Sequence, residues 1–102
     1  MAIAQAVVGT GATTLYTSSG SNATTAMFFM NDNVSARTLN LHIVPSGGTA
    51  GTANQIVKAV SIDPGDTYVI NTEKLVLSNG DFVAASASAG SSVYATISYV
   101  SI

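Results

Sequence analysis

The stretch that decides the fold is Arg37-Thr-Leu-Asn-Leu-His-Ile-Val-Pro45. Its leucines and isoleucine alternate with Asn40 and His42, which is the two-residue period of a strand with one face in a core and one face outside it. Pro45 ends the strand because proline has no N–H for the hydrogen-bond ladder. Similar segments rich in Val, Ile, Thr, Tyr and Phe recur along the chain, separated by Gly, Pro, Asn and Ser. The chain is therefore predicted to be all-β.

The same criteria predict strands on both sides of this segment. Four consecutive apolar residues, Met27 to Met30, predict a strand covered on both faces, one of them by another subunit. The alternation fails around Lys58, which indicates a bulge. About seven to nine short strands without a helical period predict one domain, residues 1–102, folded as a two-layer antiparallel β-sandwich of jelly-roll or immunoglobulin-like topology. The predicted strands are Ala2–Val8, Thr13–Thr17, 24–31, Arg37–Val44, Gln55–Ile62, 67–71, 73–77, 81–88 and 92–102.

Three connecting segments have distinctive turn chemistry. Asp63-Pro-Gly-Asp66 places Pro and Gly where a tight turn needs a fixed φ followed by a positive φ, and the chain should return as the next strand. Asn79-Gly80 is a hairpin signal between segments 73–77 and 81–88. Segment 46–54 is rich in glycine and has few large side chains, so it is predicted to be a long, mobile loop and a contact arm.

Charged residues are scarce. The chain has three Lys and Arg and five Asp and Glu among 102 residues, with a formal net charge of −2, whereas about a quarter of the residues in an ordinary domain are charged. Such a surface is typical of a protein that contacts copies of itself or a larger assembly. The few scattered cations argue against a nucleic-acid partner, since phosphate binding depends on clustered Lys and Arg.

The composition also bears on redox chemistry and membranes. The chain has no cysteine, so disulfides and thiolate metal sites are excluded. No apolar run approaches the roughly 20 residues of a membrane span, and the first residues lack the basic region of a signal peptide. We expect synthesis in the cytosol and no membrane partner.

Residues that could carry catalysis are few. His42 is the single histidine, and its place in a strand without evident partners favours a surface or interface role over acid–base catalysis. Serines are numerous, but no Gly-x-Ser-x-Gly elbow is present. The glycines of segment 46–54 lack the lysine and the following helix of a phosphate-binding loop. We expect a non-enzymatic protein with no catalytic, cofactor-binding or metal-binding residues.

Two binding alternatives involve particular residue types. Calcium prefers several carboxylates at one place, but Asp63, Asp66 and Asp81 flank turns, where Asp is common because it bonds nearby backbone. Glu73 is the remaining acid of the C-terminal half, and no EF-hand spacing occurs. Tyrosines can stack on sugar rings, so a carbohydrate-binding module is an alternative function. The tyrosines are Tyr16, Tyr68, Tyr94 and Tyr99.

Several segments together carry a family resemblance. They are Leu15-Tyr-Thr17, Asn31-Asp-Asn33, Leu41-His-Ile-Val-Pro-Ser-Gly-Gly48, the loop with Asn54, the strand to Ile62, Pro64-Gly-Asp66, Leu75-Val-Leu-Ser-Asn-Gly-Asp81 and the Val/Ile/Tyr-rich final strand. In this combination the chain resembles small structural proteins of tailed-bacteriophage virions. The resemblance implies a β-sandwich that acts as a capsid cement or decoration protein, often a trimer over junctions between major capsid proteins. Tail or fibre attachment is the rival function.

The resemblance also implies a location and a partner surface. The protein would be made in the host bacterial cytoplasm and would end in the virion, where it would contact the major capsid protein as a homo-oligomer. The residues expected at interfaces are Met1, Ala2, Ile3, Met27, Phe29, His42, Gly47, Gly48, Thr49 and Gly51.

Overall fold

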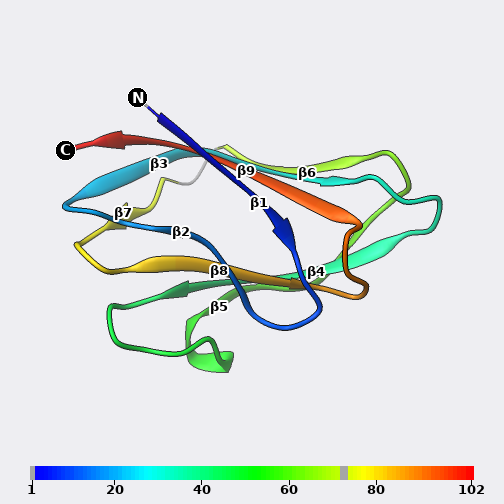
Figure 1. The fold of residues 1–102 in the computed structure, drawn as a ribbon, viewed down its shortest axis with the longest axis horizontal. Coiled ribbons are helices and arrows are strands. Elements are labelled where there is room, and N and C mark those ends of the chain that lie inside the picture. Colours follow the sequence, from blue (N-terminus) through cyan, green and yellow to red (C-terminus); the bar gives the residue numbers. More distant parts are fainter. Residues whose placement is uncertain (1, 72–73) are drawn as a thin grey trace.

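The computed structural model describes residues 2–71 and 74–102. It is a sandwich of two antiparallel β-sheets (Figure 1), as the sequence predicted. No helix among the described residues is long and apolar enough to cross a membrane. The elements are β1 (Ala2–Val8), β2 (Thr13–Thr17), β3 (Asn22–Asn31), β4 (Arg37–Val44), the 3₁₀ turn η1 (Thr52–Asn54), β5 (Gln55–Ile62), β6 (Thr67–Ile70), β7 (Val76–Leu77), β8 (Phe82–Ala87) and β9 (Val93–Ser101).

The strands are paired in a nested order. Sheet A has the order β1-β9-β3-β6, with β7 also pairing β3, and sheet B has the order β2-β8-β4-β5. The strand pairs are nested in the sequence, so that each pair is enclosed by the one before it: β1·β9, β2·β8, β3·β6 and β4·β5. Successive pairs belong to alternate sheets. This is one long hairpin rolled into two sheets, the arrangement of a jelly roll, whereas immunoglobulin sheets contain chain-adjacent strands at several places. The strand order matches that of a jelly roll, which is one of the two topologies that the sequence predicted.

The core lies between the two sheets and follows the strand period. Met27 and Phe29 of β3 in sheet A and Leu39 and Leu41 of β4 in sheet B belong to one buried cluster, and all four side chains are fully buried. The other members of the buried cluster are Val8, Leu15, Tyr16, Ile62, Leu77, Val83, Ala85, Ala87, Val93, Ala95 and Ile97.

The predicted irregularity in β5 is confirmed. The register between β4 and β5 shifts on either side of Leu41, and Ala59 takes a positive φ of 53°. The Asn40 side chain stabilises this conformation because its Oδ1 accepts a hydrogen bond from the Ala59 N–H at 2.9 Å. A bulge of this kind bends the strand and interrupts its free edge.

The predicted hairpin at Asn79-Gly80 is wrong. β7 pairs β3 in sheet A, whereas β8 lies in sheet B, so this turn connects the two layers. The Asp63–Asp66 turn forms, with the Asp66 N–H bonded to the Asp63 carbonyl at 3.0 Å, but it also leads from one sheet to the other. Turn residues determine local backbone geometry, whereas the nested pairing determines which strands meet. The predicted strand 73–77 is reduced to β7, and its first residue lies outside the described residues.

Candidate interaction surface

The outer face of sheet A carries a row of exposed apolar side chains. The register places Val7 of β1 opposite Tyr94 of β9, and Tyr94 opposite Met30 of β3. In the next row, Phe28 of β3 lies opposite Val69 of β6. Side chains directly opposite one another on one face of a sheet are close enough to interact. We define the apolar face as Ile3, Val7, Phe28, Met30, Val69 and Tyr94, each between 38% and 63% exposed.

This apolar face contains no charge. None of the strands of sheet A includes a Lys, Arg, Asp or Glu. The polar residues between the apolar ones are uncharged, such as Gln5 and Thr96, which face each other across β1 and β9. Exposed apolar side chains that gather on one face of a soluble protein usually mark an interaction site.

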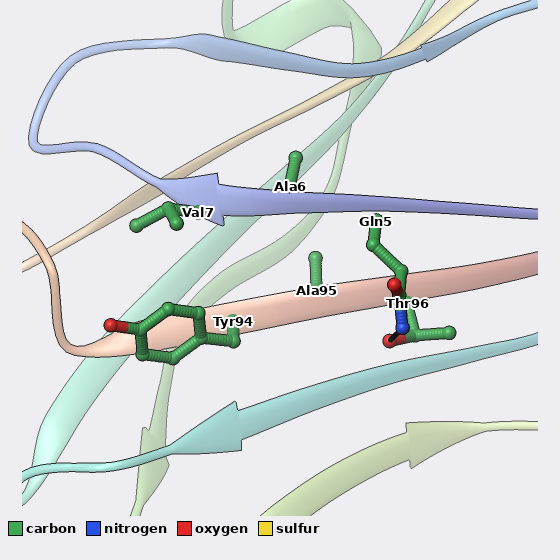
Figure 2. A pocket seen from close by; sticks show the side chains of 6 residues that line it. All are labelled: Gln5, Ala6, Val7, Tyr94, Ala95 and Thr96. Carbon is green, nitrogen blue, oxygen red and sulfur yellow. Dashed lines mark hydrogen bonds between the residues drawn. The ribbon is translucent and has the colours of Figure 1, made fainter.

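An open hollow lies on this face between β1 and β9 (Figure 2). It has a volume of about 320 Å³ and is lined by Gln5, Ala6, Val7, Tyr94, Ala95 and Thr96. The Tyr94 ring and Val7 lie at one end, and at the other end the Gln5 Nε2 donates a hydrogen bond to the Thr96 Oγ1 at 3.3 Å. A ring flanked by small and uncharged side chains can pack against an apolar group of a partner.

The outer face of sheet B carries polar side chains that hydrogen-bond to one another. Asn40 is central: its Nδ2 donates to the Ser86 Oγ at 3.3 Å, and its Oδ1 accepts from the Gln55 Nε2 at 3.1 Å as well as from the bulge. Because these groups are already paired, this face offers less driving force for association than the apolar face.

His42 lies on the same polar face and holds the glycine-rich loop. Its Nδ1 is 3.1 Å from the Gly51 carbonyl oxygen and 3.2 Å from the Asn54 Oδ1. Both partners are acceptors, so the ring donates from Nδ1. Asn54 adds a bond from its Nδ2 to the Thr49 carbonyl at 2.9 Å. The loop predicted as a mobile arm is therefore tied to the sheet, and His42 has a structural role.

The expected interface residues fall in separate places. Ala2 and Ile3 are exposed on β1, and Met1 lies outside the described residues. Met27 and Phe29 were expected at an interface, but both are fully buried in the core of a single chain and cannot contact a partner. The residues Gly47, Gly48, Thr49 and Gly51 are exposed in the loop that connects β4 to β5 of sheet B.

The exposed members of β3 are instead Phe28 and Met30. Sequence reasoning identified the apolar run but assigned its two faces the wrong way round. The run alone does not show which alternate residues point into the core, because all four residues are apolar. Asn31 follows the run directly and is fully buried, so it lies on the same face of β3 as Met27 and Phe29. Its burial is explained by its hydrogen bonds, which the sequence does not show. Val69 and Tyr94 were not expected at an interface because nothing local links them to β3.

The four tyrosines do not converge on one groove. Tyr16 and Tyr99 stack on each other with ring centroids 4.2 Å apart, and Tyr68 packs against the core. Tyr94 alone among them lies on the apolar face. Burial raises the pKa of Tyr16 above its ordinary value of 10.0, and the nearby Tyr99 also raises it, while a bond with Ser18 acts in the opposite direction.

Charged and catalytic residue types are dispersed over the molecule. Within residues 2–71 and 74–102, no group of three or more His, Cys, Asp or Glu is placed to hold a metal ion. Asp81 has a turn role, since its Oδ1 accepts from the Ser46 N–H and its Oδ2 from the Ser78 N–H, both at 2.9 Å.

Comparison with protein-family models, with curated proteins and with solved structures found no match for this chain.

Proposed function

We propose that this protein is a non-enzymatic structural protein of a bacteriophage virion, a capsid cement or decoration protein that stabilises the head by bridging major capsid proteins. It would act as a homo-oligomer, a trimer if it follows the proteins it resembles. The observation that carries the proposal is the apolar face, which lies on a sheet whose five strands include no charged residue.

Two further observations support this function. The nested strand order is that of a jelly roll, an architecture that occurs in viral capsid domains and also in lectins and cupins. Fold analogy alone does not assign function, but the charge-poor surface favours assembly over the other uses. The second observation is that the loop residues are tied by hydrogen bonds, which lowers the entropy lost when a loop is immobilised in a contact.

The proposed mechanism is mechanical. Each copy would contact neighbouring shell subunits through the apolar face, and the loop 46–54 on the opposite sheet would reach a second subunit. Individually weak contacts add up in such an arrangement, because the first contact raises the effective concentration for the next. A shell bridged in this way resists separation of its subunits.

Co-sedimentation with phage capsids that lack the protein tests the proposal. The purified protein should sediment with these shells and saturate at a fixed ratio to the major capsid protein. Substitution Met30→Lys introduces a charge into the apolar face and should weaken binding roughly tenfold, about 1.4 kcal/mol. The matched control is Thr14→Lys, which introduces the same charge at an exposed position on β2 of sheet B. It should bind as the unmodified protein does.

The rival functions give different results in parallel assays. A tail or fibre component would sediment with tails and not with shells. A carbohydrate-binding module would respond in a glycan titration, and Tyr94→Ala would abolish the response. Binding to shells that is equally lost in both lysine variants, or absent altogether, would refute the cement function.

A further inference from the structure

β1 is an edge strand of sheet A, and its outer side is open to pairing. It pairs β9 along all seven of its residues without a register shift, and within the described part of the chain no strand pairs its other side. The segment Ala-Ile-Ala-Gln-Ala-Val-Val contains no charge, Pro or Gly. An edge strand of this kind presents unpaired N–H and C=O groups that another strand can pair with.

The other edge strands have features that discourage pairing with a further strand. β5 has Lys58 and the bulge at Ala59. β2 is five residues long and has a register shift between Thr14 and Tyr16. β6 and β7, which both pair β3, are four and two residues long. Bulges, charges and short length all discourage pairing at an edge, so β1 stands out as the edge left open.

The residues of β1 are complementary to a second β1 running antiparallel. In the register centred on Gln5, Ile3 of each copy lies opposite Val7 of the other, and Ala4 lies opposite Ala6. Ile3 and Val7 are 63% and 46% exposed in one chain, so each pair would cover apolar surface on both sides of a two-fold axis. No charges meet across the axis, and this register pairs all seven residues.

We propose that the open edge of β1 pairs with β1 of a second copy of this chain through this two-fold contact. The pairing joins the two A sheets into one continuous sheet and places both apolar faces on the same side. The inference is independent of the proposed function. A two-fold contact joins copies in pairs, so a three-fold assembly would use other surfaces.

Sedimentation equilibrium over a range of concentrations tests the contact. The unmodified protein should show a species of twice the chain mass of 10.3 kDa, or a multiple of that pair. Ile3→Lys should raise the dissociation constant about tenfold, because the symmetry removes two apolar pairs at once. Val76→Lys is the matched control, since Val76 is 68% exposed on β7 of the same sheet. This variant should associate as the unmodified protein does.

Disulfide trapping tests the register. The chain has no cysteine, so Gln5→Cys introduces a single thiol, and residues directly opposite in paired strands have Cβ atoms about 5 Å apart. Mild oxidation should give a covalent dimer in high yield. Ile56→Cys, on the protected edge of β5, should give little.

Three results would overturn the inference. They are a protein that remains monomeric at high concentration, association that Ile3→Lys leaves unchanged, and equal trapping of the two cysteine variants. Far-ultraviolet circular dichroism of each variant shows whether the fold is retained. None of these results bears on capsid binding, so the proposed function is tested separately.

Discussion

Replacing Asn31 by alanine should destabilise the fold more than any other polar truncation at its end of the sandwich. The residue ends β3 and is fully buried. Its Nδ2 donates to the carbonyl oxygens of Ser35 at 3.0 Å and Ile62 at 2.9 Å, and its Oδ1 accepts from the Asn33 N–H at 3.0 Å. The amide thus joins the end of β3, the following loop and the end of β5.

The magnitude follows from these three hydrogen bonds. Each is worth about 1 kcal/mol net, and a buried carbonyl left without its partner costs about 1 kcal/mol or more. Asn31→Ala should therefore lower the free energy of unfolding by about 3 to 4 kcal/mol, a large part of the roughly 5 to 15 kcal/mol of a typical domain. The corresponding fall in Tm is roughly 15 to 25 °C for a domain of this size.

Urea unfolding followed by circular dichroism measures this change. All variants are compared at one protein concentration, since association makes stability concentration-dependent. The control is Asn33→Ala in the same loop, which removes one exposed bond at 3.2 Å to the Ser35 N–H and should cost about 0.5 kcal/mol. An Asn31→Ala variant within about 1 kcal/mol of the unmodified protein, or no less stable than Asn33→Ala, would refute the reasoning.

Three further predictions concern a turn, a tyrosine and a loop. Gly80→Ala should lower the free energy of unfolding by about 2 kcal/mol, because φ at Gly80 is +89° and the new Cβ would lie 2.9 Å from the Ser46 Cβ. The control is Gly90→Ala, whose new Cβ would lie in open space and which should change the urea midpoint little. Burial raises the pKa of Tyr16, so the folded state holds this proton longer and stability should fall as pH rises above about 10. Tyr16→Phe should remove that component of the alkaline transition, and an unchanged pH dependence would contradict the assignment. Deletion of residues 47–53 should weaken shell binding in co-sedimentation while the circular dichroism spectrum is retained, and unchanged attachment would exclude the loop as a contact.

Local sequence pattern was sufficient to locate most of the strands. Arg37–Val44 and Gln55–Ile62 were predicted with the bounds that the structure has, because alternation and turn residues are properties of neighbouring residues. The bulge near Lys58 was also visible as a break in that alternation. The two-layer architecture then followed from the number of short strands and the absence of a helical period.

Strand pairing was not accessible in the same way. The nested order brings β1 beside β9 and β2 beside β8, and these partners are separated by most of the chain. Asn79-Gly80 has the chemistry of a hairpin turn but connects two sheets. The outward orientation of Phe28 and Met30 depends on the phase of β3 relative to the core, and the apolar face exists only because β1, β3, β6 and β9 are neighbours. Its residues come from four separate segments, and no single segment identifies it.

According to the proposed function, binding of this protein reinforces a phage head. The most direct measurement is the temperature at which shells lacking the protein rupture and release their contents, recorded with increasing amounts of the purified protein. The proposed function predicts that rupture shifts to higher temperature and that the shift saturates at the ratio where binding saturates, with Thr14→Lys as effective as the unmodified protein and Met30→Lys requiring more. Protein that binds the shells to saturation without changing the rupture temperature would contradict the proposed function.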